Sequence, residues 1–145
     1  MEDYQSAFME RHIDTQTLDQ SGRKVAAMHF GGVTIECLLK YMIFAQPLPK
    51  GATQEWMTDS YDPGHTFTNP GHSYIEALKR HNRLRSRIDN SRDARKWLDE
   101  VENPNGQHFI HMRYSGIEPD DPNYKRWLYA YQSLNGWLQK QITTL

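Results

Sequence analysis

The stretch RKVAAMHFGGVTIECLLKYMIFA spans residues 23–45 and carries the clearest structural signal in the chain. Apolar side chains surround it almost completely, which predicts a central helix that is buried on most sides. The pair Gly31-Gly32 lowers helix propensity by roughly 1 kcal/mol at each position, and a helix tolerates such a pair where another helix must approach closely. Pro47 and Pro49 follow and end the element.

Helical patterns also dominate the sequence on both sides of this stretch. A short first helix is expected at about residues 3–12. Further along, Ser73 and Glu76 have the spacing of a capping box, which predicts a helix start. Apolar residues then recur at intervals of three and four as far as Ile88, so one continuous helix is expected there.

The second half of the chain completes an all-helical pattern. Helices are expected at about residues 91–101 and 123–142, the second with a long apolar stripe. The segment HFIHMRYSG at 108–116 has the local propensity of a strand, but no other segment offers it a strand partner. The expected fold is therefore all-α, an up-and-down bundle of four to five helices, in which the helices at 23–45 and 123–142 pair antiparallel.

A long connection at about residues 46–71 interrupts this pattern. It is rich in Pro, Gly, Thr and Asp, and a structureless loop of that length is unusual in a compact domain. Residues 1–145 are otherwise expected to form a single domain. A short helical turn near 53–58 and four apolar side chains are expected to hold the loop: Trp56, Met57, Tyr61 and Phe67.

Composition limits the classes of protein that need to be considered. Apolar residues make up 37% and charged residues 24%, which is typical of a globular domain. The first residues, Met1–Tyr4, do not resemble a secretory signal, and polar residues break the apolar run at 25–45, so no membrane span is expected. Cys37 is the single cysteine, so no intrachain disulfide can form. These features predict a cytoplasmic protein.

The net charge of −1 conceals one basic segment. Residues 79–96 contain eight basic residues and two acidic ones. Within this segment Arg80, Arg83 and Arg87 are spaced to share one helical face, which could hold phosphates through bidentate guanidinium contacts. No aromatic residues alternate with them, so base stacking is not indicated. The alternative is a solvated face that offsets the acidic segments of the chain.

Glu36 is the one carboxylate inside the long apolar helix. Burial of a lone carboxylate is unfavourable unless a cation pairs with it. Lys40 lies four residues later, in the favourable order for a helical ion pair, and Arg113 is another possible partner. A structural ion pair between Glu36 and Lys40 is therefore expected, with a functional carboxylate as the alternative.

The histidines do not indicate a metal site. His65 and His72 stand in two Pro-Gly-His triplets, but zinc needs about four ligands and no cysteine lies near them. His72 directly precedes the expected cap at Ser73, so the second triplet is interpreted as a helix start. His108 and His111 are expected to be structural or solvent-facing. Neither a metal nor another cofactor is predicted.

Three segments of this sequence resemble the HEPN family of helical domains. The stretch AMHFGGVTIECLLKYMI at 27–43 is similar to the second helix of that family, which often carries Gly-x-x-x-Glu-Cys-x-Leu-Lys. GHSYIEAL at 71–78 resembles the turn that opens its third helix, and Arg113-Tyr114 matches an Arg-Tyr pair that precedes its last helix. The order and spacing agree over roughly residues 20–142. The matching residues of the first stretch are Gly32, Glu36, Cys37, Leu39 and Lys40.

The resemblance implies a bundle of four to five helices that commonly dimerises. Members often accompany nucleotidyltransferases, toxin–antitoxin pairs or other RNA-related systems. The catalytic members are metal-independent ribonucleases with an Arg-x(4–6)-His motif on a later helix at the dimer interface. This chain has no histidine in range after Arg113. Its one literal match joins Arg23 to His29 on an early helix, where residues six apart sit about 120° from each other.

These observations lead to one functional expectation and two alternatives. We expect a non-catalytic HEPN-like binding or regulatory module, a homodimer, that contacts RNA, nucleotide or an acidic partner through its basic helix. The first alternative is a toxin-type ribonuclease with a non-standard site. The second is a structural partner for a protein encoded by a neighbouring gene. The ribonuclease site would be built from Arg113, Tyr114 and a histidine, either His108 or His111.

Overall fold

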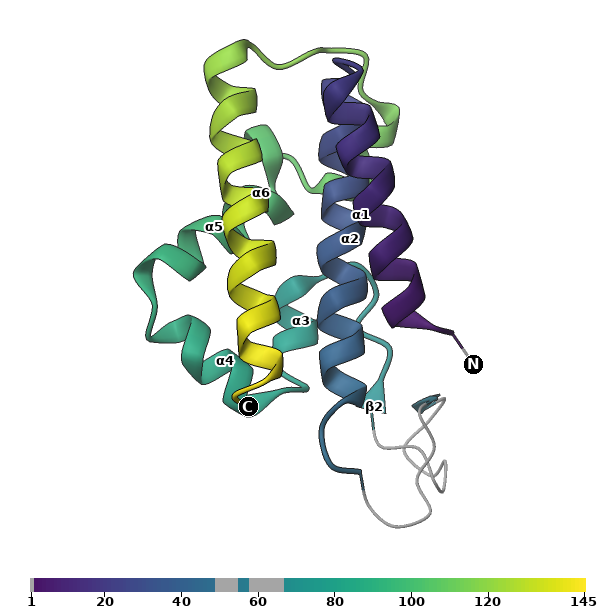
Figure 1. The fold of residues 1–145 in the computed structure, drawn as a ribbon, viewed down its shortest axis with the longest axis vertical. Coiled ribbons are helices and arrows are strands. Elements are labelled where there is room, and N and C mark those ends of the chain that lie inside the picture. The colour runs from purple at the N-terminus through teal and green to yellow at the C-terminus, as the bar shows by residue number, and fades with distance from the viewer. Residues whose placement is uncertain (1, 49–54, 58–66) are drawn as a thin grey trace.

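The structure is a computed structural model that describes residues 2–48, 55–57 and 67–145, and most of its regular structure is helical (Figure 1). This confirms the all-α prediction. The α-helices are α1 (Tyr4–Gln20), α2 (Lys24–Phe44), α3 (Tyr74–Leu78), α4 (Asn82–Asp89), α5 (Arg92–Glu102) and α6 (Asp121–Ile142). Two 3₁₀ helices, η1 (Pro104–Gly106) and η2 (Phe109–Tyr114), connect α5 to α6. Within the described residues, none of the helices combines the length and apolar character needed to cross a membrane.

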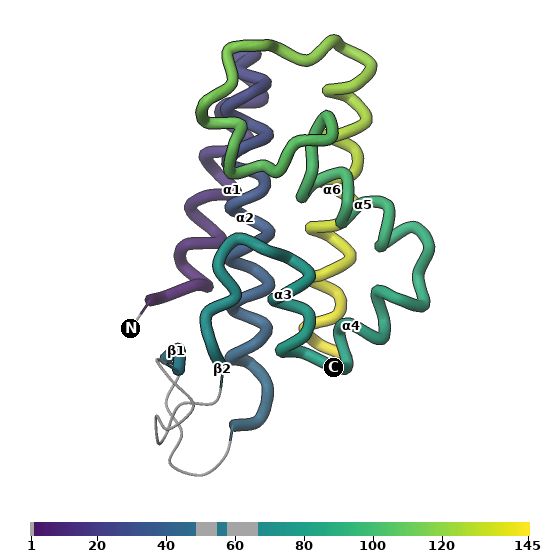
Figure 2. Tube along the Cα trace, turned by 180° about the vertical axis from the view of Figure 1, so that it is seen from behind, coloured from purple at the N-terminus to yellow at the C-terminus, as the bar shows by residue number. Residues whose placement is uncertain are grey.

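Helix α1 is longer than the sequence predicts and packs along α2. It starts at Asp3, whose side chain accepts a hydrogen bond from the Ser6 amide at 3.0 Å. It continues to Gln20, and Gly22 then takes a positive φ of 73° in the tight turn before α2. Both views show α1 and α2 side by side as an antiparallel pair (Figures 1 and 2).

Helix α2 is the centre of the core, as its nearly continuous apolar surface predicts. Most of its residues after Ala26 are buried. A Cβ atom added to Gly31 would lie 2.5 Å from the Trp127 ring of α6. At Gly32 the added Cβ would lie 2.1 Å from the ring of Phe109 in η2. The two glycines therefore allow one α-helix and one 3₁₀ helix to approach closely, which is the role predicted for them.

Helices α2 and α6 run in the same direction, so the predicted antiparallel pairing is wrong. Lys24 Nζ lies 2.6 Å from Asp121 Oδ1, and this ion pair joins the first turns of the two helices. Met42 and Ile142, from their last turns, line one pocket. Between them the chain descends in α3, ascends through α4 and α5, and then returns to the starting end of α2 before α6 begins (Figure 1). In an up-and-down order, helices with one ascending segment between them must be parallel.

The predicted helix from Ser73 to Ile88 is two helices in the structure. Ser73 caps α3 as expected, because its side chain accepts a hydrogen bond from the Glu76 amide at 3.2 Å. The chain then turns at His81, whose Nδ1 accepts from the Leu84 amide at 3.1 Å and so caps α4. His81 is buried. Its apolar spacing therefore reflects a buried cap and not the interior of a helix.

The described parts of the long connection pack against the end of α2. The ring centres of Trp56 and Phe67 lie 4.5 and 6.1 Å from that of Phe44, so two of the four side chains expected to hold the loop pack on α2. Strands β1 (Trp56–Met57) and β2 (Phe67–Thr68) form a two-residue parallel pair. The helical turn predicted near 53–58 is wrong at Trp56 and Met57, and no pairing of strands was predicted. Tyr61 lies outside the described residues.

Residues 109–114 form η2 and not a strand, despite their strand propensity. His108 starts the element, and its Nδ1 accepts a hydrogen bond from the Ile110 amide at 3.2 Å. Phe109 and Met112, three residues apart, are both buried. A 3₁₀ helix places residues at this spacing on one side, which lets both reach the core.

Candidate functional site

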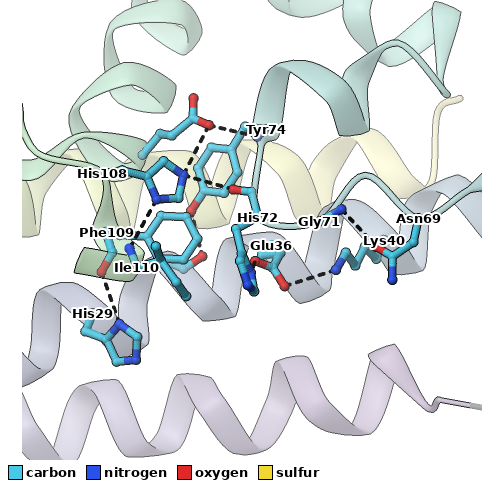
Figure 3. A network of polar contacts seen from close by, with 12 residues as sticks. His29, Glu36, Lys40, Asn69, Gly71, His72, Tyr74, His108, Phe109 and Ile110 are labelled. Carbon is cyan, nitrogen blue, oxygen red and sulfur yellow. Dashed lines mark hydrogen bonds and ion pairs between the residues drawn. The ribbon is translucent and has the colours of Figure 1, made fainter. Parts of the chain in front are cut away.

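One face of α2 carries three polar side chains, His29, Glu36 and Lys40. They are spaced by seven and four residues, so they share one side of the helix. Figure 3 shows them along this side, with His72 and Phe109 packed across them. We call this the polar face of α2. It holds two neighbouring arrangements, a hollow near His29 and a carboxylate–histidine pair at Glu36.

The hollow lies between the first turns of α2 and the chain that follows η2. It has a volume of about 400 Å³. Arg23, His29 and Arg113 line it together with Phe30 and Met112, and we call it the Arg–His hollow. The side chain of Arg23, the residue at the N-cap of α2, makes no capping hydrogen bond. The positive end of a helix of 21 residues therefore opens beside the two arginines.

The orientation of His29 fixes the tautomer of its neutral ring within this hollow. Its Nδ1 lies 3.1 Å from the backbone oxygen of Phe109. A carbonyl oxygen only accepts hydrogen bonds, so Nδ1 carries the proton and donates it. The neutral ring then has its lone pair on Nε2, which can accept a proton or a hydrogen bond.

The electrostatics of the hollow favour an anion. Arg23 and Arg113 are exposed. The Arg113 guanidinium also lies 4.8 Å from the centre of the Tyr114 ring. Glu118 lines the hollow as well, so two arginines against one carboxylate leave it net positive. The donors of a guanidinium match two phosphate oxygens at once, which makes phosphate the anion best suited to this site.

The predicted ion pair at Glu36 is present and has a third member. Lys40 Nζ lies 3.1 Å from Glu36 Oε2, and both side chains are largely buried. The other carboxylate oxygen, Oε1, lies 2.6 Å from Nδ1 of His72. The sequence analysis placed His72 only before a helix cap, so this contact was missed. Arg113, the other partner considered for Glu36, lines the Arg–His hollow instead.

A second carboxylate–histidine contact ties the start of α3 to η2 (Figure 3). Glu102 accepts a hydrogen bond from the Tyr74 amide at 2.8 Å. Burial raises the pKa of Glu102. His108 Nε2 lies 3.0 Å from the backbone oxygen of His72 and 3.7 Å from Glu102. Tyr74 in turn donates its hydroxyl to the Gly32 carbonyl at 2.6 Å.

The residues proposed for a non-standard ribonuclease site do not converge as a group. Both ring nitrogens of His108 are engaged, with the His72 carbonyl and the Ile110 amide, so its ring is a structural clamp. His111 and Tyr114 are exposed on η2. Arg113 lines the Arg–His hollow, where its histidine neighbour is His29. The literal Arg-x(5)-His match in the sequence joins Arg23 to His29, and both residues line this hollow.

The sequence predicted that Arg80, Arg83 and Arg87 share one face of a continuous helix. The structure does not show this arrangement. Arg80 lies in the turn between α3 and α4, and its guanidinium bonds the backbone oxygen of Thr68 at 2.7 Å. Arg87 bonds the backbone oxygen of Thr144, also at 2.7 Å. The helix break at the buried cap separates these arginines. Two of the three guanidinium groups are thus engaged by the protein itself, while Arg83 is exposed.

No metal centre is evident in the part of the chain that the structure describes. That part contains no group of three or more His, Cys, Asp or Glu side chains able to hold a metal ion. His65 falls in the segment that is not described, so its pairing with His72 is not tested. Cys37 is buried, and burial, followed by the charge of Glu36, raises the pKa of its thiol to about 11. It is therefore a protonated core residue.

Comparisons with protein-family models, with curated proteins and with solved structures find no match to this chain. Function must therefore be argued from the two arrangements on the polar face of α2.

Proposed function

We propose that this chain is an HEPN-like binding module, a cytoplasmic homodimer, whose Arg–His hollow holds phosphate groups of RNA. The resemblance of residues 27–43, 71–78 and 113–114 to HEPN domains supports the choice of RNA as the ligand. The all-α architecture is compatible with that family. The proposal moves the expected phosphate contact from the basic segment to the hollow.

One observation carries this proposal: the uncapped start of α2 meets Arg23, His29 and Arg113 in a single hollow. Backbone amides at a helix start and the helix dipole both favour an anion. Arg23 and Arg113 come from distant parts of the chain, yet both are exposed and adjacent to the same space. A phosphodiester would receive charge from two guanidinium groups and a hydrogen bond from the helix end.

The basic segment is a weaker candidate for the same contact. Arg80 and Arg87 use guanidinium donors on Thr68 and Thr144, and a phosphate would have to displace those bonds. Among the described residues, the Arg23 guanidinium makes no hydrogen bond that a phosphate in the hollow would have to displace.

The test is the binding of a fluorescently labelled mixed RNA pool, measured by anisotropy between 50 and 200 mM salt. The double variant Arg23→Gln/Arg113→Gln is expected to bind about tenfold or more weakly than the unmodified chain. The dependence of log K on log salt should also become shallower by about 1.4, since each single-stranded phosphate contact contributes roughly 0.7. Glutamine keeps the length and polarity of the side chains and removes the charge.

The matched control is Arg83→Gln/Arg92→Gln, which removes two exposed arginines from the basic segment. Its affinity should stay within about twofold of the unmodified chain. An equal loss in both variants would contradict the hollow as the site, and a larger loss in the control would return it to the basic segment. If the unmodified chain binds no RNA, the proposal fails, and a protein encoded by a neighbouring gene becomes the partner to seek.

A second candidate function, metal-independent RNA cleavage in the same hollow, is favoured by the orientation of the His29 ring. Its Nε2 has the free lone pair that a general base needs to activate a ribose 2′-hydroxyl. The measurement is cleavage of the labelled pool in the presence of EDTA. His29→Gln, whose amide can still donate to the Phe109 carbonyl, should lower the rate by about 100-fold or more. Intact RNA after prolonged incubation with the unmodified chain would leave binding as the only activity.

A further inference from the structure

His72 has an environment that neither the core nor the Arg–His hollow explains. Its side chain is 55% exposed, whereas the carboxylate that it contacts is only 12% exposed. The ring stands in the turn between Gly71 and the start of α3, at the surface of the polar face of α2 (Figure 3). The protein therefore holds an exposed imidazole against a largely buried charge.

The contact fixes which nitrogen of His72 is available. Glu36 Oε1 lies 2.6 Å from Nδ1, and a carboxylate oxygen can only accept, so Nδ1 carries the proton. The neutral ring then has its lone pair on Nε2. Since Nδ1 is occupied by Glu36 and the side chain is exposed, Nε2 is the ring nitrogen left to react with a molecule from solvent.

The carboxylate is itself held in place by a third group. Lys40 Nζ binds the other oxygen, Oε2, at 3.1 Å, and its side chain is 7% exposed. Lys40 thus orients Glu36, and Glu36 orients His72. The two contacts use different oxygens of the Glu36 carboxylate. A nucleophile that is oriented by a second group, which is oriented by a third, is the arrangement used in nucleophilic catalysis.

We propose that Nε2 of His72 is a phosphoryl-acceptor site that takes a phosphoryl group from a small phosphoramidate or acyl phosphate donor. The Nε2 lone pair attacks phosphorus, a nitrogen–phosphorus bond forms, and the bond from phosphorus to the leaving group breaks. With phosphoramidate the leaving group departs as ammonia. The Nδ1 proton stays between the ring and Glu36, whose negative charge offsets the positive charge that develops on the ring. No electrons are gained or lost from outside, and no metal is needed.

The exposed histidine His111 provides an internal comparison in the same molecule. Its ring packs edge-on to His108 at 6.3 Å, and among the described residues no carboxylate is paired with it. Exposure alone would therefore label His72 and His111 at similar rates. Orientation by Glu36 would make His72 faster.

The test is incubation of the full chain with potassium phosphoramidate at pH 7.5, followed by site mapping with mass spectrometry under neutral conditions. The unmodified chain should be phosphorylated at His72 at least about tenfold faster than at His111, a threshold set below the roughly 10²–10⁴-fold that a positioned acid–base group contributes. Glu36→Gln should slow labelling of His72 to the rate of His111. His111→Gln should leave the rate at His72 unchanged.

Equal rates at the two histidines in the unmodified chain would overturn the proposal, as would a rate at His72 that Glu36→Gln does not change. Circular dichroism shows whether Glu36→Gln is folded. Should it fail to fold, the ratio of His72 to His111 in the unmodified chain decides the question, because both residues then belong to one intact molecule. The outcome is independent of RNA binding, since the Arg–His hollow contains neither His72 nor Glu36.

Discussion

Two of the seams that join helix α6 to the rest of the bundle have opposite chemistry, one against α2 and one against α1. Against α2 it packs by shape, with the Trp127 ring filling the space above Gly31. Against α1 it packs through polar groups, with the Tyr131 hydroxyl 2.6 Å from Nδ1 of His12 and the Asn135 amide nitrogen at 3.3 Å. We call these the glycine seam and the histidine seam. The glycine seam depends on the lack of a Cβ atom at Gly31. The histidine seam depends on the lone pair of His12 Nδ1.

The glycine seam continues beyond α6 to η2. Phe109 is fully buried and lies over Gly32, the next residue of α2. The rings that pack on these two glycines, those of Trp127, Tyr131 and Phe109, carry no charge at neutral or mildly acidic pH, so this packing should respond little to pH. It should respond strongly to volume, because close-packed interiors have little room for added atoms.

The histidine seam has a defined direction of hydrogen bonding. The hydroxyls of Thr15 and Thr34 donate to backbone oxygens at 2.8 and 2.7 Å. The Asn135 amide nitrogen can only donate, so His12 Nδ1 is an acceptor, and the Tyr131 hydroxyl donates to it. Burial raises the pKa of Tyr131 to about 12, which keeps this donor protonated. The comparison teaches that α6 is held on one side by packing and on the other by the neutral form of a histidine.

The glycine seam is tested by Gly32→Ala, for which the largest effect is expected. The new Cβ would lie 2.1 Å from the ring of Phe109, and a buried ring has few places to move. We expect the free energy of unfolding to fall by about 2–3 kcal/mol, as overpacking typically does. Urea denaturation at pH 7.5 measures the change.

Gly136→Ala on α6 is the matched control for this substitution. Gly136 is exposed, and no atom lies within 4 Å of the position that its Cβ would occupy. Alanine should therefore stabilise the helix by roughly 0.8–1 kcal/mol through propensity alone. Both substitutions gain this propensity, so the difference between them isolates the clash. A stabilising Gly32→Ala would show that η2 does not pack as described.

The histidine seam is tested by Tyr131→Phe. The substitution removes the donor to His12 Nδ1 and leaves the Asn135 amide nitrogen as the remaining contact of that atom. We expect a loss of about 1–2 kcal/mol, which reflects a poorly satisfied acceptor that is half-buried. Tyr129→Phe, at a residue that is 65% exposed, should change stability by less than about 0.5 kcal/mol. Equal effects of the two substitutions would show that the hydrogen bond from Tyr131 to His12 does not contribute to stability.

Local sequence patterns were sufficient for the glycine seam but not for the histidine seam. The apolar surround of α2 and the pair Gly31-Gly32 predict a buried helix with a close neighbour, and both are observed. His12 lies at the edge of the short first helix that was expected, and nothing nearby in sequence marks its partner. Tyr131 is 119 residues away. Only the tertiary fold brings an acceptor and a donor at that separation together.

Separation along the sequence also explains which parts of the site were predicted. The Glu36–Lys40 pair follows from a spacing of four residues on one helix, and it is present. The contact of Glu36 with His72 joins residues 36 apart, and the approach of Arg113 to His29 joins segments still further apart in sequence. The helix break at His81 was missed for a different reason. A buried histidine that caps a helix has the same apolar spacing as one inside a helix.

The smallest expected effect is the pH dependence that the histidine seam should produce and the glycine seam should not. Burial lowers the pKa of His12, and burial followed by the charge of Arg83 lowers the pKa of His81. A histidine with a lowered pKa in the folded state binds protons more tightly when unfolded. Its contribution to stability is therefore complete above an unfolded pKa of about 6.5 and is lost as the pH falls below that value.

Glu102 acts in the opposite direction, because burial raises its pKa and the folded state takes up its proton first as the solution becomes acidic. The test must therefore isolate the histidine. Unfolding free energies of the unmodified chain and of His12→Gln, measured between pH 7.5 and 5.5, should differ in slope. The glutamine amide oxygen can accept from Tyr131 but does not titrate, so the variant should lose less stability on acidification. His111→Gln, at an exposed histidine, should keep the slope of the unmodified chain. Equal slopes in all three proteins would mean that α6 is held against α1 without the neutral His12 ring, and the two seams would not differ in kind.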